Sequence, residues 1–209
     1  MAPQARSPRD TQEASSRPGG PGPRSERRRL SHVDRGGRPR MVDVTGKAST
    51  ARRAVAEAEV VVSQETLSLV IDGTAEKGDV LGVAELAGVM AGKRTAELIP
   101  LCHPLALTQL LVSVRPDRGA GVLRVRAEAA TTGPTGVEME ALTAVAVAAL
   151  TIYDMLKSAE RGITIREVRL TSKSGGASGD WHRPDEALAR AAPPPGTRGP
   201  ARTGGRRRT

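Results

Sequence analysis

Aromatic residues and cysteine are almost missing from this chain of 209 residues. It has no Phe, one Tyr (Tyr153), one Trp (Trp181) and one Cys (Cys102). A hydrophobic core must therefore be built from Ala, Val, Leu and Ile, and single-stranded nucleic acid would find no aromatic stacking platform. A single cysteine excludes an intramolecular disulfide and is typical of a reducing compartment.

Apolar runs of membrane-spanning length are missing as well. Residues 1–20 contain no apolar stretch that could form the core of a secretory signal. The uncharged run between Glu140 and Asp154 has thirteen residues, whereas a spanning helix needs roughly 20. The sequence therefore predicts a soluble, cytoplasmic protein without a membrane partner.

The formal net charge of +9 is carried by the two ends of the chain. Residues 1–40 have a net charge of +6, residues 181–209 of +5, and residues 41–180 of −2. Both ends are rich in Arg, Pro and Gly and lack a hydrophobic period, so we expect disordered tails. The sequence predicts one folded domain over residues 41–180, which is large enough to be a catalytic domain. The tails could bind nucleic acid only loosely and non-specifically.

Alternating apolar and polar residues predict four strands in the middle of the chain. In the last strand the apolar phase slips near Arg166 and Glu167, which indicates a β-bulge. The second and third strands are joined by a short turn and form a hairpin. The predicted strands cover residues 54–62, 107–115, 121–129 and 163–171.

Helical segments are expected over residues 79–98 and 136–158, with Asp79 as the N-cap of the first. Residues 63–73 could form a short helix or a turn, with Ser63 as a cap. The two longer helices and the strands follow the order strand, helix, strand, strand, helix, strand. This order predicts an α+β, ferredoxin-like βαββαβ fold, an antiparallel sheet with helices packed on one face.

Asp154 and Lys157 end the second long helix and share a face by their i, i+3 spacing. An exposed pair of this kind needs no function. The neighbouring Ile152, Met155 and Leu156 instead indicate partial burial, and a buried pair can lower the pKa of a lysine and prepare it for proton transfer.

The start of the same helix carries two further carboxyl groups. Glu138 follows Thr135 in a capping-box pattern, which offers it a structural role beside a catalytic one. Glu140 has no such structural role. At about 100° per residue, Glu140 and Asp154 point within roughly 40° of each other around the helix.

Cys102 and His103 lie between Pro100 and Pro104, where the backbone is stiff. One Cys and three His do not form a zinc set with usable spacing, so no metal site is predicted. A histidine at a helix–strand junction is more often structural than catalytic. Lys77, Lys93 and Lys173 would each be ordinary surface residues unless the fold brings them together.

Four segments of the chain carry recognisable motifs: MVDVTGKASTARRA (41–54), KGDVLGVAELAGVMAGKRTAELIPLCHPL (77–105), TGVEMEALTAVAVAALTIYDMLK (135–157) and KSGGASGD (173–180). With IPLCHP, TGVEMEALT and TIYDM together, they resemble the molybdenum cofactor biosynthesis protein C family, the cyclic pyranopterin monophosphate synthases. The resemblance covers about residues 41–180.

The resemblance implies a ferredoxin-like subunit assembled as a hexamer, a trimer of dimers, with active sites between subunits. It implies that a cyclised dihydroguanosine triphosphate is rearranged to cyclic pyranopterin monophosphate with release of pyrophosphate. No cofactor is expected, although Mg²⁺ could accompany the triphosphate. By matching position, Asp154, Lys157 and Lys77 are catalytic, and the substrate-binding residues are Leu101, Cys102, His103, Met139, Glu140, Glu138, Lys93, Arg52 and Lys173.

The chain departs from the family pattern at three places. Leu156 replaces a common cysteine, whereas Pro134 and Ala177 replace common basic residues and reduce the positive charge available to a triphosphate. Two other readings remain beside the enzyme: a nucleic-acid-binding protein that uses its Arg-rich ends, and a catalytically inactive relative. Intact Asp154 and Lys157 argue against the inactive relative.

Overall fold

The structure is a computed structural model that describes residues 36–184. The chain divides into two units, Met1–Pro39 and Arg40–Thr209, and every element below belongs to the second. Most of both predicted tails lies outside the described residues. The elements are β1 (Thr50–Val61), α1 (Gln64–Ile71), α2 (Val80–Lys93), α3 (Thr95–Leu98), β2 (Gln109–Asp117), β3 (Val122–Gly133), α4 (Glu138–Leu156), β4 (Thr164–Ser174) and β5 (Trp181–His182).

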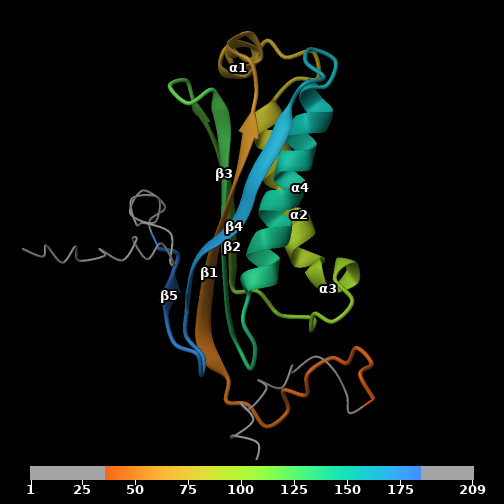
Figure 1. Ribbon diagram of the computed structural model, residues 1–209, viewed down its shortest axis with the longest axis vertical. Helices are drawn as coiled ribbons and strands as arrows, with labels where there is room; N and C mark the ends of the chain where they lie inside the picture. Colours follow the sequence, from red (N-terminus) through yellow and green to blue (C-terminus); the bar gives the residue numbers. More distant parts are fainter. Residues whose placement is uncertain (1–35, 185–209) are drawn as a thin grey trace, which may run out of the picture. The chain divides into compact units, whose positions relative to one another are not determined.

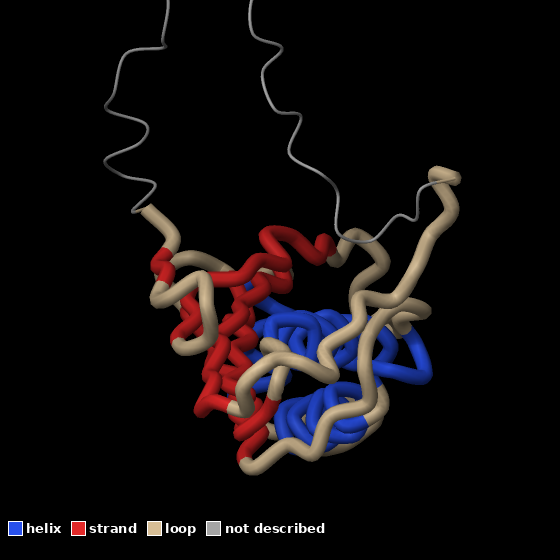
Figure 2. Tube along the Cα trace, turned by 90° about the horizontal axis from the view of Figure 1, so that it is seen from below, coloured by secondary structure: helices blue, strands red, loops and turns tan. Residues whose placement is uncertain are grey.

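The strands form one antiparallel sheet in the order β2-β3-β1-β4-β5. Helices α2 and α4 cover one face of this sheet (Figure 1), and the view along the strands in Figure 2 shows the helical and strand layers side by side. The predicted α+β, ferredoxin-like fold is confirmed. Because β3 lies between β1 and β2, the first βαβ unit is split as the element order predicts.

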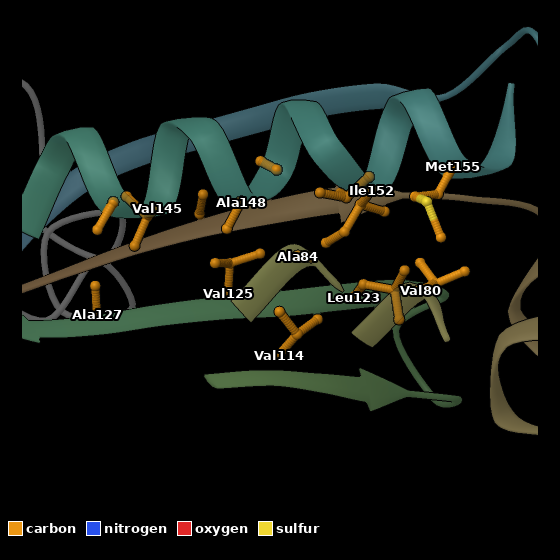
Figure 3. Packing of buried hydrophobic residues seen from close by; sticks show 14 of the residues in the cluster. Val80, Ala84, Val114, Leu123, Val125, Ala127, Val145, Ala148, Ile152 and Met155 are labelled. Atoms are coloured by element: carbon orange, nitrogen blue, oxygen red, sulfur yellow. The ribbon is translucent and has the colours of Figure 1, made fainter. Parts of the chain in front are cut away.

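The core lies between α4 and the sheet and is made of small aliphatic side chains (Figure 3). Val145, Ala148 and Ile152 of α4 are fully buried, as is Val125 of β3. Small residues also let the two long helices approach closely, because a Cβ on Gly88 of α2 would lie 2.9 Å from the Ala144 carbonyl oxygen. Closely packed small side chains therefore fill the core without large aromatic residues.

Helix α4 is the one candidate for a membrane span that the described residues contain, by length and composition alone. It has 19 residues and a mean hydropathy of 1.5, so the short uncharged run is not a sufficient argument against a span. Its buried face packs on the sheet (Figure 3). The apolar character of α4 is accounted for by this core contact.

The structure corrects the predicted helix over residues 79–98, which is interrupted. Asp79 caps α2 as predicted, since its carboxylate accepts a hydrogen bond from the Gly82 amide at 2.9 Å. However, α2 ends at Lys93, and α3 begins at Thr95, whose hydroxyl donates to the Gly92 carbonyl at 3.0 Å. Hydroxyl side chains compete with the backbone for such carbonyls, and the spacing of apolar residues does not reveal this.

Two other local predictions have opposite outcomes. The capping box of Thr135 and Glu138 is wrong, because the N-cap of α4 is Val137 and no side chain caps it. The bulge in β4 is confirmed, since the β1–β4 register shifts between Glu57 and Glu59 and Glu167 has a φ of 57°. In addition, β5 continues the sheet past residue 180, where the predicted domain ends.

Candidate active site

Lys77, Asp154 and Lys157 converge at the C-terminal end of α4, where they form an ion-pair cluster. Lys77 Nζ lies 2.9 Å from Asp154 Oδ2 and also donates to the Asp154 carbonyl oxygen at 2.7 Å. Lys157 Nζ binds the other carboxylate oxygen, Oδ1, at 2.7 Å. The loop between α1 and α2 brings Lys77 to this point, although 77 residues separate it from Asp154 in the sequence.

The electrostatics of this cluster correct the expected lysine pKa. The Asp154 and Lys157 side chains are 57% and 54% exposed, so the pair is not buried. The hydrogen bond from Lys157, followed by that from Lys77, lowers the pKa of Asp154 to about 2. The hydrogen bond to Asp154 raises the pKa of Lys157 rather than lowering it. In this chain Lys157 is therefore a cation held in place by Asp154.

A second group of predicted residues surrounds the N-terminal end of α4. Glu138, the first residue of the helix, lies 3.2 Å from Lys173 Nζ in β4. Arg52 of β1 donates to the carbonyl oxygens of Gly133 and Pro134, at 3.0 and 3.1 Å. Three elements distant in the sequence thus meet around the turn that precedes α4.

The Leu101–Cys102–His103 segment follows α3 and belongs to the same end of the domain. The Cys102 amide closes a turn on the Ile99 carbonyl at 3.0 Å. His103 Nε2 lies 2.8 Å from the Val42 carbonyl oxygen, which holds the ring against the N-terminal segment. Burial, and then the charge of Glu140, raise the pKa of the Cys102 thiol, so this cysteine is not an activated nucleophile.

Glu140 is the one buried acidic residue of the described chain, at 4% exposure. Burial raises its pKa, and the charge of Glu138 adds to the effect. Together with Lys93 it lines a cavity of about 130 Å³ next to Pro104. Met139, between the two glutamates, is 37% exposed.

A larger cavity, of about 670 Å³, opens beside Arg52 and the glycine loop after β4. Lys47 lines it, and so does Thr50, whose buried hydroxyl has no hydrogen-bond partner. Sequence reasoning passed over Lys47, although this residue lies within the MVDVTGKASTARRA segment. The predicted first strand begins at residue 54, whereas β1 begins at Thr50. With the earlier start, Lys47 is a cation just before a strand, which is the signal that could have identified it.

Comparison with known proteins decides the family. The MoaC family model matches residues 41–176. The chain belongs to the MoaC family.

Curated relatives of this MoaC chain match along nearly their whole length. A Brucella ovis protein named cyclic pyranopterin monophosphate synthase is 55% identical over 162 residues, which cover 78% of this chain and 98% of the relative. A Thermomicrobium roseum protein with the same name is 56% identical over the same shares of both chains. The matched family segment contains all twelve predicted site residues but ends before β5.

The two groups of the MoaC chain lie at opposite ends of α4 (Figure 1). Glu140 and Asp154 are fourteen residues apart, and at 1.5 Å per residue this is about 21 Å along the helix. Although the two side chains are predicted to point in similar directions around the helix, they are too far apart to act together within one copy. In the described part of the chain, no three His, Cys, Asp or Glu residues are grouped so as to hold a metal ion.

Proposed function

We propose that this MoaC-family chain is a cyclic pyranopterin monophosphate synthase, a lyase of molybdenum cofactor biosynthesis. The name denotes conversion of (8S)-3',8-cyclo-7,8-dihydroguanosine 5'-triphosphate to cyclic pyranopterin monophosphate, with release of pyrophosphate. The observation that carries the proposal is the 55% identity to enzymes of this name over nearly their full length. The ion-paired cluster of Lys77, Asp154 and Lys157 supports it, because it provides two cations held on one carboxylate.

The chemistry makes two demands that these residues can meet. Pyrophosphate leaves when an internal hydroxyl attacks the innermost phosphorus, and cations that neutralise the developing negative charge lower this barrier. Opening and reclosing the purine-derived ring requires proton transfers. We assign both tasks to Lys77 and Lys157, with Asp154 holding them in position. The raised pKa of Lys157 keeps it an ammonium ion, which suits it first to neutralise the charge of the triphosphate.

The separation of the two groups supports a site shared between copies of the chain. Neither end of α4 carries the complete set of residues, and about 21 Å of helix divides them. An apolar stripe on α2 offers a contact surface, since Val83, Leu86 and Met90 are 43%, 62% and 55% exposed. We therefore propose a homo-oligomer, a hexamer built from dimers, in the cytoplasm. Mg²⁺ could travel with the triphosphate, held by its phosphate oxygens.

The test is pyrophosphate release from the cyclic dihydroguanosine triphosphate by the full-length protein. Removing the charge in Asp154→Asn should reduce kcat by about 100-fold or more, because both lysines lose their anchor. Glu57→Gln serves as a control, since its carboxylate lies on the open face of the sheet, 41% exposed and 3.9 Å from Arg126. A folded wild-type protein that releases no pyrophosphate would contradict the proposed function.

A further inference from the structure

Arg52 is placed to hold two backbone segments rather than a ligand alone. Its Nε and Nη2 groups donate to the successive carbonyl oxygens of Gly133 and Pro134, at 3.0 and 3.1 Å. A planar guanidinium can reach both acceptors at once, whereas the single ammonium of a lysine cannot reproduce this fork. Two edges of the side chain are thus occupied by the turn before α4.

The remaining edge of the guanidinium faces the glycine loop after β4. A Cβ on Gly176 would lie 2.1 Å from Arg52 Nη1 and 2.9 Å from Cζ. Gly176 also has a φ of +77°, which favours glycine. The glycine therefore leaves room for Arg52, which is enclosed between the turn and the loop.

The Glu138–Lys173 ion pair joins the start of α4, which follows the turn, to the end of β4, which precedes the glycine loop. Lys173 Nζ lies 3.2 Å from Glu138 and 2.9 Å from the Ser178 hydroxyl within the loop. No side chain caps the start of α4, so the entry into the helix lacks the usual local support. The contacts of Arg52 to Gly133 and Pro134 supply that support from β1.

We propose that Arg52 is a positioning residue, which fixes the turn before α4 against the glycine loop and so sets the geometry of Glu138 and Lys173. The inference rests on the proposed function, because the resemblance to that enzyme family implies that Glu138 and Lys173 contact the substrate. This positioning role differs from direct contact with the substrate, which is the role that the family resemblance implies for Arg52.

The first test is amide hydrogen exchange in the full-length protein, which needs no activity. Arg52→Lys keeps the positive charge but loses the fork, and Gly176→Ala displaces the guanidinium. We expect each to speed exchange of the Ala141 amide, whose hydrogen bond to the Val137 carbonyl opens α4, by about tenfold or more. Two matched controls should stay within about twofold of wild type: Arg53→Lys, on the opposite face of β1, and Gly179→Ala, which has a similar φ of +66° but nothing within 4 Å of the added Cβ.

The second test is kinetic and uses pyrophosphate release. We expect Arg52→Lys to lower kcat by about 10- to 100-fold, as small displacements of reacting groups do. In a Glu138→Gln background the same change should cause a clearly smaller loss, because Arg52 acts in part through Glu138.

Two results would overturn the inference: unchanged exchange with a rise in KM alone, which indicates direct substrate contact, or full additivity with Glu138→Gln. If wild-type protein releases no pyrophosphate, the proposed function fails. The exchange experiment still decides whether Arg52 fixes the turn.

Discussion

At the scale of single residues, Asp154 determines the state of the lysines around it. Each of its carboxylate oxygens accepts a hydrogen bond from one lysine, and these bonds lower its pKa to about 2. The sequence pairs Asp154 with Lys157 by spacing alone, but it contains no sign that Lys77 comes to the same carboxylate. The helix end is partly buried as expected, at Ile152, Met155 and Leu156. Burial of the pair itself was wrong, because Asp154 and Lys157 point outward.

Asp154→Asn should lower the pKa of Lys157 towards the ordinary lysine value of 10.5. The amide keeps the shape of the side chain but removes the negative charge that favours the ammonium. The measurement is an NMR titration of ¹³C-labelled lysine side chains, with the other lysines as internal reference. A wild-type Lys157 that titrates below 10.5 would contradict the assigned role as a held cation.

Glu140→Gln should stabilise the folded protein at neutral pH. Because the folded-state pKa of Glu140 is raised, its contribution to stability is present below about pH 4.5, the unfolded value, and is lost as pH rises through the folded pKa. Glutamine does not ionise. We expect the variant's Tm to exceed that of wild type at pH 7, by about 2–4 °C for each kcal/mol of removed penalty, and the gap to close below pH 4.5.

Thermal unfolding at several pH values measures this difference. Glu97→Gln is a suitable control, because it removes a carboxylate that is 62% exposed. A Glu140→Gln variant that is less stable than wild type at pH 7 would show that the carboxylate makes a stabilising contact there.

At the scale of elements, the strands order the charges on the open face of the sheet. Glu59 of β1 stands directly opposite Arg124 of β3 and Arg166 of β4 in the two ladders. It is paired with both arginines, and its side chain is only 13% exposed. Glu57, on the same face, is 41% exposed and approaches Arg126 only to 3.9 Å.

Glu59→Ala should therefore cost about 1–2 kcal/mol of unfolding free energy, because it leaves two arginines without their shared partner. Glu57→Ala is the matched control and should cost less than about 0.5 kcal/mol, as exposed pairs do. Urea denaturation of both variants measures the difference. Equal losses would show that the closer pairing of Glu59 adds nothing to the ladder.

At the scale of the whole molecule, the site residues occupy two ends of one long helix. Residues at the Asp154 end and the Lys173 end can share a substrate only if two copies contribute. In a dimer with two shared sites, a copy with Asp154→Asn and a copy with Lys173→Ala would form one intact site between them.

Co-expression of these two variants with different tags should restore activity that neither has alone. Each hybrid dimer has one intact site in two, so the purified hybrid should have about half of wild-type activity, and an unfractionated random mixture about a quarter. Tandem purification of the hybrid and an assay of pyrophosphate release provide the measurement. A hybrid that stays as inactive as its parents would indicate that each copy carries its own complete site.

The sequence by itself determined the order of the elements, because residue periodicity depends on which face each element buries. It also determined the family, because the family motifs are read from the residues alone. The helix caps at Ser63 and Asp79 were predictable as well, since each cap acts over three residues. Local patterns of this kind require no knowledge of distant partners.

Only the tertiary structure decided which of the site residues meet. Lys77 reaches Asp154 and Arg52 reaches Gly133 across 77 and 81 residues of sequence. It also decided that Glu138 pairs with Lys173 instead of capping its own helix, and that Lys157 has a raised pKa. These outcomes depend on the distances and solvent exposure created when separate elements pack, and sequence spacing carries neither quantity.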